Sequence, residues 1–251
     1  MSSTRRQVQE RLRGFALRRG YDVRRFDSGR SMASRRIRAI ERTGVDVVLD
    51  VGANRGQWAA ELRNSGYDGR MVSLEPLAEP YAALVARTST DPDWDAQRIA
   101  LGAEDATASI NVAGNIVSSS MLEMTERHVT GAPASAQIGT ESVHVARLDT
   151  IAPELLGDQT RPYLKLDVQG YELQALLGAS STLDSVQVVE AELSVVELYA
   201  GQPLLPEVFE HLRARGFECI GLDPGFTDVR SGEMLQADGL FVRRSTSTVE
   251  E

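Results

Sequence analysis

The 251-residue chain is 42% hydrophobic and 25% charged, with a formal net charge of −9. This length suits one α/β domain with a modest extension, and no apolar run approaches the ~20 residues that a bilayer-spanning helix requires. Cys219 is the only cysteine, which excludes a disulfide framework and a cysteine-based zinc site. The N-terminus lacks the apolar segment of a secretory signal, so we expect a soluble, cytoplasmic protein without stable membrane insertion.

Charge divides the chain into an arginine-rich arm and an acidic body. Residues 1–42 hold 13 arginines against four acids, whereas residues 43–251 hold 14 basic and 32 acidic residues. Apolar residues along the arm suggest an amphipathic helix, which could bind anionic lipid, nucleic acid or an acidic surface. A transit peptide has a similar composition and is the less favoured alternative. We favour packing on the acidic body of the same chain or of a second subunit, which predicts a homodimer and no nucleic-acid partner.

Strand-like and helix-like segments alternate after this arm. The pattern predicts an α/β fold with a Rossmann-like, doubly wound, mostly parallel sheet and helices on both faces. The expected strands are 45–51, 69–74, 94–101, 163–168, 186–193, 217–222 and 240–243, and the expected helices are 56–65, 79–86, 171–177 and 206–215. Segments 107–112 and 141–148 alternate polar and apolar residues and predict an additional strand pair, with loops and a short helix (121–128) between them. The expected organisation is a helical arm (1–42), one domain (43–244) and a flexible tail (245–251).

The motif VVLDVGANRGQW at residues 47–58 carries the most information. An aliphatic run passes the acid Asp50, turns at Gly52 and Gly56 and opens onto a helical pattern, as at the start of a nucleotide-binding sheet. The glycines would let the chain turn where a Cβ atom would obstruct a ligand. The spacing differs from the G-x-G-x-x-G of dinucleotide sites, and an acid before the glycine suits a ligand with an amine and a sulfonium better than one with phosphates. A structural turn in another α/β protein is the alternative.

A second acid, Glu75, ends the next apolar strand, about 20 residues beyond the glycine turn. A carboxylate there can accept hydrogen bonds from both ribose hydroxyls of an adenosine group. Enzymes that use NAD share this device, so Glu75 indicates an adenosine ligand without identifying it. The residues predicted to contact the cofactor are Asp50, Gly52, Ala53, Asn54, Gly56, Gln57, Glu75, Pro76, Ala100 and Asp167.

From about residue 45 to 243 the chain resembles the FkbM family of class I S-adenosylmethionine-dependent methyltransferases. The resemblance rests on the order and spacing of LDVGANRG, SLEP, PYLKLDVQGYE, EAELSVVELYAGQPLLPEV and QADGLFVRR. It implies methyl transfer from S-adenosyl-L-methionine to a hydroxyl oxygen, as in actinobacterial enzymes that methylate sugars of polysaccharides or glycolipids, methylmannose polysaccharides included. The family commonly has an acid where this chain has Gln169, an amide that keeps hydrogen bonding but removes a charge.

Methyl transfer to an alcohol requires alignment of oxygen, methyl carbon and sulfur, and a group that removes the hydroxyl proton. His144 lies between two valines on a predicted strand, where it is either a core histidine or the general base, and it is our first choice of base. Asp167 follows a strand and should lie near the methyl group. Asp167, Glu192 and Asp238 could hold Mg²⁺, which would lower a hydroxyl pKa. Alternatively, these acids bind the cofactor's amine, sugar hydroxyls or arginines.

Polar residues of the loop segments are the candidates for the acceptor site. They are Ser119, Ser120, His128, Tyr199 and Gln202. The acceptor expected from the resemblance is a hydroxyl of a saccharide, a glycolipid or a glycosylated natural product. Two other functions stay open: a nicotinamide-dependent oxidoreductase, which the missing G-x-G-x-x-G disfavours, and a non-catalytic cofactor-binding scaffold tethered through the arm.

Overall fold

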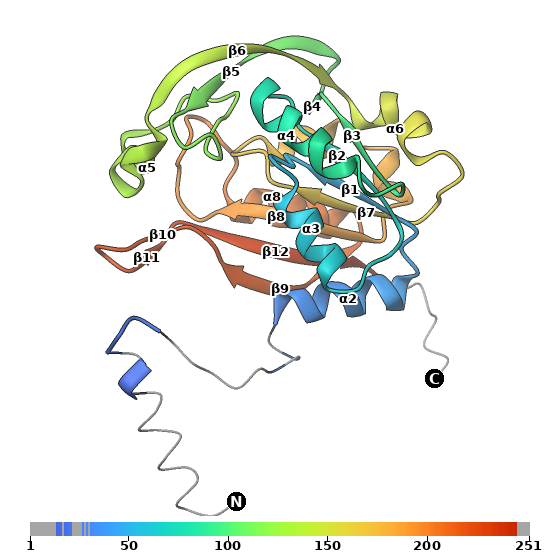
Figure 1. The fold of residues 1–251 in the computed structure, drawn as a ribbon, viewed down its shortest axis with the longest axis horizontal. Helices are drawn as coiled ribbons and strands as arrows, with labels where there is room; N and C mark the ends of the chain where they lie inside the picture. The colour runs from blue at the N-terminus through green and yellow to red at the C-terminus, as the bar shows by residue number, and fades with distance from the viewer. Residues whose placement is uncertain (1–13, 17, 22–26, 28, 30, 245–251) are drawn as a thin grey trace, which may run out of the picture.

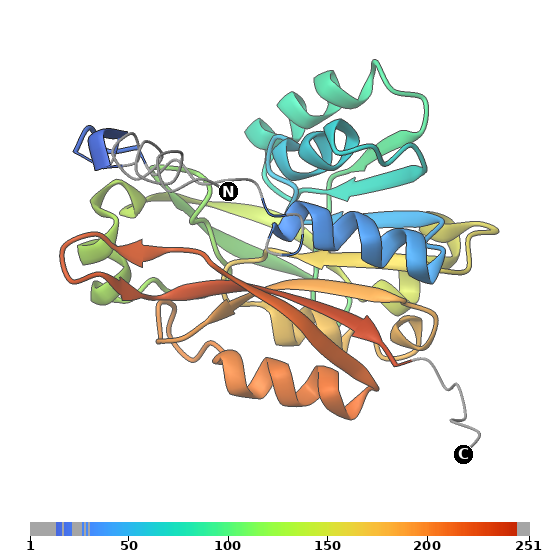
Figure 2. The same ribbon diagram turned by 90° about the horizontal axis from the view of Figure 1, so that it is seen from below.

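The computed structural model describes residues 14–16, 18–21, 27, 29 and 31–244. Its main feature is a seven-stranded sheet in the order β3-β2-β1-β7-β8-β12-β9 (Figures 1 and 2). The strands are β1 (Val47–Val51), β2 (Arg70–Leu74), β3 (Trp94–Gln97), β7 (Pro162–Leu166), β8 (Val188–Ser194), β9 (Phe217–Pro224) and β12 (Gln236–Arg243). Strand β12 runs antiparallel to both of its neighbours, while the pairs formed by β1, β2, β3, β7 and β8 are parallel. The predicted Rossmann-like sheet is confirmed.

Helices cover both faces of this sheet, because side chains alternate along each strand. Val48, Tyr163 and Leu240 face a layer formed by α2 (Met32–Thr43), α3 (Gln57–Asn64) and α4 (Ala78–Thr88). The alternate residues of the same strands face α6 (Leu148–Leu156), α7 (Glu172–Leu177) and α8 (Leu205–Ala214). Burial on both faces explains why the parallel strands are almost continuously apolar in sequence.

Helix α2 crosses the predicted boundary between arm and domain at residue 42. Ser31 begins it, with its hydroxyl accepting a hydrogen bond from the Ser34 amide, and Gly44 ends it in the left-handed conformation. Ala39 and Ile40 pack into the core on the α2–α3 face. The second part of the arginine-rich segment is therefore part of the folded body. The predicted amphipathic stripe falls mostly, and the tail 245–251 entirely, outside the described residues.

A smaller sheet, in the order β4-β6-β5, arches over the edge of the large one (Figure 1). It consists of β4 (Ala100–Leu101), β5 (Ala106–Ala113) and β6 (Gln137–Ala146), with helix α5 (Glu126–Gly131) between the last two. The pairing of β5 with β6 confirms the predicted strand pair. Strands β10 (Thr227–Asp228) and β11 (Glu233–Met234) form a separate hairpin.

Several predicted boundaries were wrong, including the starts of the strands predicted at 141–148 and 240–243, which begin at 137 and 236. The segment 94–101 is not one strand, because β3 pairs with β2 while β4 leaves for the small sheet and pairs with β6. Leu148 begins helix α6 instead of ending a strand, and the short helix lies at 126–131 instead of 121–128. None of the described helices is long and apolar enough to cross a membrane.

Candidate active site

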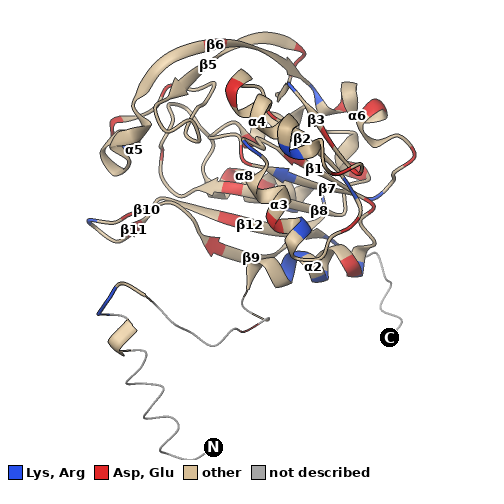
Figure 3. Cartoon of the chain, viewed as in Figure 1, with Lys and Arg blue, Asp and Glu red and all other residues tan. Residues whose placement is uncertain are grey.

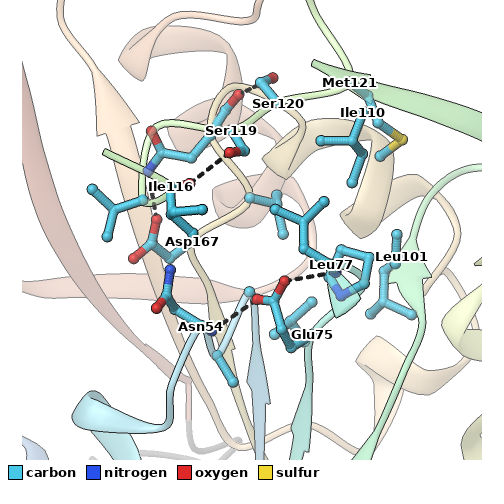
Figure 4. A pocket seen from close by; sticks show the side chains of 18 of the residues that line it. Asn54, Glu75, Leu77, Leu101, Ile110, Ile116, Ser119, Ser120, Met121 and Asp167 are labelled. Atoms are coloured by element: carbon cyan, nitrogen blue, oxygen red, sulfur yellow. Dashed lines mark hydrogen bonds between the residues drawn. The ribbon is translucent and has the colours of Figure 1, made fainter. Parts of the chain in front are cut away.

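A cavity opens at the carboxyl ends of β1, β2 and β7, next to the small sheet (Figure 4). It holds about 820 Å³ of empty space, mouth included. Its polar lining residues are Asn54, Gln57, Glu75, Ser119, Ser120, Lys165, Asp167 and Gln169, and its apolar ones include Leu77, Ile99, Ala100, Leu101, Ile110, Ile116, Val117 and Met121. Gly52, Ala53 and Pro76 also line it. In the close-up, Leu101 and Ile110 lie across the cavity from Asn54 and Asp167.

The turn after β1 depends on Gly52, which has a φ of +72°. A Cβ atom at this position would lie 1.9 Å from the carbonyl oxygen of Asp167, so only glycine fits between the ends of β1 and β7. Gly56 has a different role from the one predicted: it does not line the cavity. Its Cβ would meet Leu84 Cδ1 at 2.8 Å, so Gly56 allows α3 to pack closely against α4.

Glu75 lines the cavity with its carboxylate held by backbone amides. Asn54 N donates to Oε2 and Leu77 N donates to Oε1, both at 2.8 Å. Burial raises the pKa of Glu75 to about 7, although these two hydrogen bonds favour the ionised form. Each carboxylate oxygen can accept a further hydrogen bond, so the residue is arranged for two neighbouring hydroxyl donors.

Asp50 lies outside the cavity, which corrects its prediction as a cofactor contact. It is fully buried on the α2–α3 face of β1, because side chains alternate between the two faces of the sheet along the strand. Its Oδ1 lies 3.1 Å from Lys165 Nζ, and Ser73 Oγ donates to Oδ2 at 3.3 Å. The Lys165 ammonium also lies 3.6 Å from Asp167 Oδ2. Asp50 therefore positions Lys165 beside the cavity.

Gln169 connects the polar groups at the end of β7. Its Nε2 donates to Asp167 Oδ1 at 2.7 Å and to Glu192 Oε2 at 2.9 Å, and its Oε1 accepts from the Tyr199 hydroxyl at 2.6 Å. Gln236 Nε2 donates to the same Glu192 oxygen at 2.6 Å. Burial, together with the neighbouring Asp167, raises the pKa of Glu192 well above its ordinary range. A carboxylate at position 169 could not donate to both acids.

The predicted metal ligands, Asp167, Glu192 and Asp238, do not form a metal site. Within the described part of the chain, no group of three or more His, Cys, Asp and Glu side chains could hold a metal ion. The Gln169 amide nitrogen lies between Asp167 and Glu192, where a shared cation would have to bind. The arrangement of the described residues therefore does not support Mg²⁺ at these three positions.

Neither histidine that was predicted near the substrate lines the cavity. His144 is exposed on the face of β6 opposite its buried valines, so the structure does not place this predicted general base in the cavity. His128 is 2% exposed and packs edge-on against Tyr199, with ring centroids 4.9 Å apart. Burial lowers the pKa of His128, which is consistent with a neutral core histidine.

Most of the residues predicted to contact the acceptor lie behind the cavity wall or form hydrogen bonds within it. Ser119 and Ser120 line it, but Ser119 Oγ donates to a carbonyl of its own loop and Ser120 Oγ donates to the Gln169 carbonyl, both at 2.6 Å. Tyr199 and Gln202 are buried and do not line it, and Gln202 Oε1 accepts from the Tyr199 amide at 2.7 Å. The structure thus gives no acceptor contact to Tyr199 or Gln202.

Apart from Ala100, the apolar residues that line the cavity were missed from the sequence. Ile110 is a large apolar residue buried on strand β5, a signal that something must cover that face. Ile116 adopts a φ of +65°, which is rare for a β-branched residue and costs on the order of 1–3 kcal/mol. A hydrogen bond of 2.9 Å from its amide to the Ala113 carbonyl helps to hold it against the cavity.

A buried ion pair anchors α2 beside the site. Arg36 Nε and Nη2 donate to the two oxygens of Glu190 at 2.8 and 2.6 Å. Trp58 Nε1 donates to the same carboxylate at 3.3 Å, and the Tyr163 hydroxyl also donates to it. Although burial opposes ionisation, Arg36 outweighs it and lowers the pKa of Glu190. The four side chains fix α2 and α3 on the sheet next to Lys165.

Comparison with known proteins identifies the family to which this chain belongs. A family model described as the methyltransferase FkbM domain matches residues 50–219, and no curated protein matches. Among solved structures, a precorrin-6y C5,15-methyltransferase from Geobacter metallireducens is 12% identical over 84% of this chain and 87% of its own, with a TM-score of 0.42. An rRNA methylase from Streptococcus thermophilus is 8% identical over 86% and 98%, with a TM-score of 0.45. Because the family model matches more than half of the residues, the chain belongs to the FkbM family of S-adenosylmethionine-dependent methyltransferases.

Proposed function

We propose that this methyltransferase transfers the methyl group to a hydroxyl oxygen of a saccharide or a glycosylated natural product. The observation that supports the proposal is the cavity itself, in which apolar side chains lie across from polar ones and the carboxylates of Glu75 and Asp167 line the wall. Glu75 would hold the ribose hydroxyls, and Leu77, Leu101 and Ile110 would pack on the adenine ring. When bound, S-adenosylmethionine supplies an electrophilic methyl group. Gly52 lines the cavity, and its close approach to Asp167 holds the end of β1 beside the end of β7, where the rest of the cofactor would pass.

Asp167 takes the role of base in this proposal. Its side chain is 41% exposed, and one oxygen is oriented by Gln169 Nε2 at 2.7 Å. The Lys165 ammonium lies 3.6 Å from the other oxygen. A carboxylate at the cavity mouth can accept the proton of an acceptor hydroxyl as that oxygen attacks, which is the contribution expected of a general base.

Calorimetric titration with S-adenosylhomocysteine tests the cofactor, and transfer of label from [methyl-¹⁴C]S-adenosylmethionine to neutral glycosides and oligosaccharides tests the acceptor. We expect micromolar binding that EDTA does not change, and label in the saccharide fraction. Absence of S-adenosylhomocysteine binding would contradict the proposal, and NAD⁺ titration would then test the oxidoreductase alternative. Binding without transfer to any hydroxyl compound would favour the scaffold.

Cofactor affinity should fall as the pH is lowered from 8 to 5.5. The pKa of Glu75 is raised to about 7, so protonation below that pH removes an acceptor for ribose hydroxyls, and the Kd should rise by up to about tenfold per pH unit. In Glu75→Gln, affinity at pH 8 should be about 10- to 100-fold weaker and its pH dependence should be lost. A wild-type Kd that stays constant across this range would show that Glu75 does not contact the ligand.

Asp167→Asn should lower kcat by about 10²- to 10⁴-fold while S-adenosylhomocysteine affinity changes little. The amide keeps the size of the side chain but cannot take the hydroxyl proton. His144→Ala is the control, because His144 is exposed on the outer face of β6 and should leave kcat unchanged. Radiolabel transfer to the acceptor found above is the measurement. The opposite result, a loss in His144→Ala and none in Asp167→Asn, would restore His144 as the base.

A further inference from the structure

A second cleft lies on the α2–α3 face of the sheet and shares Trp58, Lys165 and Asp167 with the first cavity. It holds about 670 Å³ of empty space, mouth included. We call it the acidic cleft. It is lined by Met32, Ala33, Arg36, Trp58, Glu61, Lys165, Leu166, Asp167, Glu190, Glu192, Asp223 and Asp238. Acidic bands on β8, β12 and β9 and a basic band on β7 lie next to one another in Figure 3.

Strand register produces this row of acids. Asp238 on β12 lies opposite Glu192 on one side and opposite Asp223 on the other. All three therefore lie at the same edge of the sheet as Asp167. Because β12 runs against its neighbours, its first residues reach the edge where β7 and β8 end.

The basic groups of the cleft are already paired, whereas some of its acids are not. Arg36 is bound to Glu190, and the Lys165 ammonium lies between Asp50 and Asp167. No described residue donates a hydrogen bond to the carboxyl of Asp223 or Asp238. Burial and the nearby Glu190 and Asp167 raise the pKa of Asp238 to about 6, so near neutral pH this carboxyl can accept hydrogen bonds.

We infer, on the basis of the proposed function, that the acceptor is a neutral polyhydroxylated molecule that binds in the acidic cleft, with hydroxyls donating to Asp223 and Asp238 and the reacting hydroxyl at Asp167. The cleft meets the cofactor cavity at Asp167. The acceptor thus enters beside α2, on the other side of Asp167 from the Ser119 loop. Helix α2, part of the arginine-rich segment, forms one wall of the acceptor site.

The chemistry of the lining favours a neutral sugar over an ion. A phosphate or carboxylate would be repelled by the six acids of the cleft, and its two cations are already paired. A cationic ligand would compete with Arg36, whose guanidinium already lies over the Trp58 ring, 4.9 Å from its centroid. Sugar hydroxyls, by contrast, can donate to the free carboxylates of Asp223 and Asp238 without displacing a cation.

Saturation-transfer difference NMR tests this site directly. Methyl α-D-glucopyranoside and maltotriose are the probes, with the protein saturated by S-adenosylhomocysteine. Ala33→Trp would fill the cleft from the first turn of α2, and Glu41→Trp is the matched control, because Glu41 is exposed in the last turn of the same helix and does not line the cleft. We expect saccharide signals from the wild type and Glu41→Trp, and at least about tenfold weaker binding by Ala33→Trp.

A second variant, Asp223→Asn, changes charge without filling the cleft, and should weaken saccharide binding about 3- to 30-fold. Unchanged saccharide binding by folded Ala33→Trp, or in Asp223→Asn, would overturn the site. No saccharide signal from the wild type, or preference for glucose 6-phosphate or glucosamine over the neutral probe, would overturn the ligand class. S-adenosylhomocysteine binding is measured separately in the wild type and in each variant. If the wild type does not bind S-adenosylhomocysteine, it is the proposed function that has failed, and not only the acceptor site.

Discussion

Gly52→Ala should abolish S-adenosylhomocysteine binding and destabilise the fold. The added Cβ would lie 1.9 Å from the Asp167 carbonyl oxygen, so the ends of β1 and β7 would have to separate. The positive φ adds strain on the order of 1 kcal/mol for a residue with a side chain. Since Asp167 and the Gly52 turn both border the cavity, their separation should change the site as well as the stability.

Gly201→Ala is the matched control for this effect. Gly201 has the same φ of +72°, but nothing lies within 4 Å of its Cβ position. It should therefore show the conformational cost without the collision. The free energy of unfolding in urea and the S-adenosylhomocysteine Kd are the two measurements. Equal stability losses in the two variants, with cofactor binding retained in Gly52→Ala, would show that the backbone approach does not shape the site.

Arg36→Ala should lower the free energy of unfolding by about 3–5 kcal/mol at pH 7. The substitution leaves Glu190, which is 5% exposed, as a buried carboxylate without its cation. In the native protein Arg36 lowers the pKa of Glu190, so the pair stabilises the fold above the unfolded pKa of a glutamate, and this contribution is lost as the pH falls through the folded value. Without Arg36 that pKa should rise, so the deficit of the variant should shrink as the pH is lowered toward 5.

Two comparisons distinguish the loss of the buried Arg36–Glu190 ion pair from the general effect of removing a charge. The double variant Arg36→Met/Glu190→Leu removes both charges and should recover part of the loss, because no uncompensated ion is then buried. Arg213→Ala breaks an exposed pair with Glu210 and should change stability little. Urea unfolding at pH 7 and pH 5 provides the data. A loss in Arg36→Ala no larger than in Arg213→Ala would mean that Glu190 is solvated or neutral.

The structure explains the role of Gln169, the residue at which the sequence departs from the family motif. In the sequence it is only an amide where an acid is common. In the structure its two ends serve different partners, donating to Asp167 and Glu192 and accepting from Tyr199. The amide thus joins groups that would repel each other, and it does so at a φ of +54°, which few residues without a local hydrogen-bond network adopt.

Glu75 and His144 illustrate which features of the site can be predicted from the sequence and which cannot. Glu75 was predictable as a cavity residue because a strand followed by an acid directs that acid to the carboxyl edge of a parallel sheet. His144 could not be placed in this way, because period-two alternation shows that it lies opposite two valines, but not which face is turned to the cavity. That choice is made by how the small sheet packs over the large one.

Local patterns in the sequence determined the α/β architecture, the glycine turn after β1 and the acid after β2, because each depends on residues within one strand and its turn. The tertiary structure alone decided that Asp50 holds Lys165, that an amide joins Asp167 to Glu192, and that α2 forms a wall of the acidic cleft. These features depend on which strands are neighbours. Arg36 and Glu190 are 154 residues apart in the chain, and no local period relates them; the strand order and the packing of α2 on the sheet bring them together.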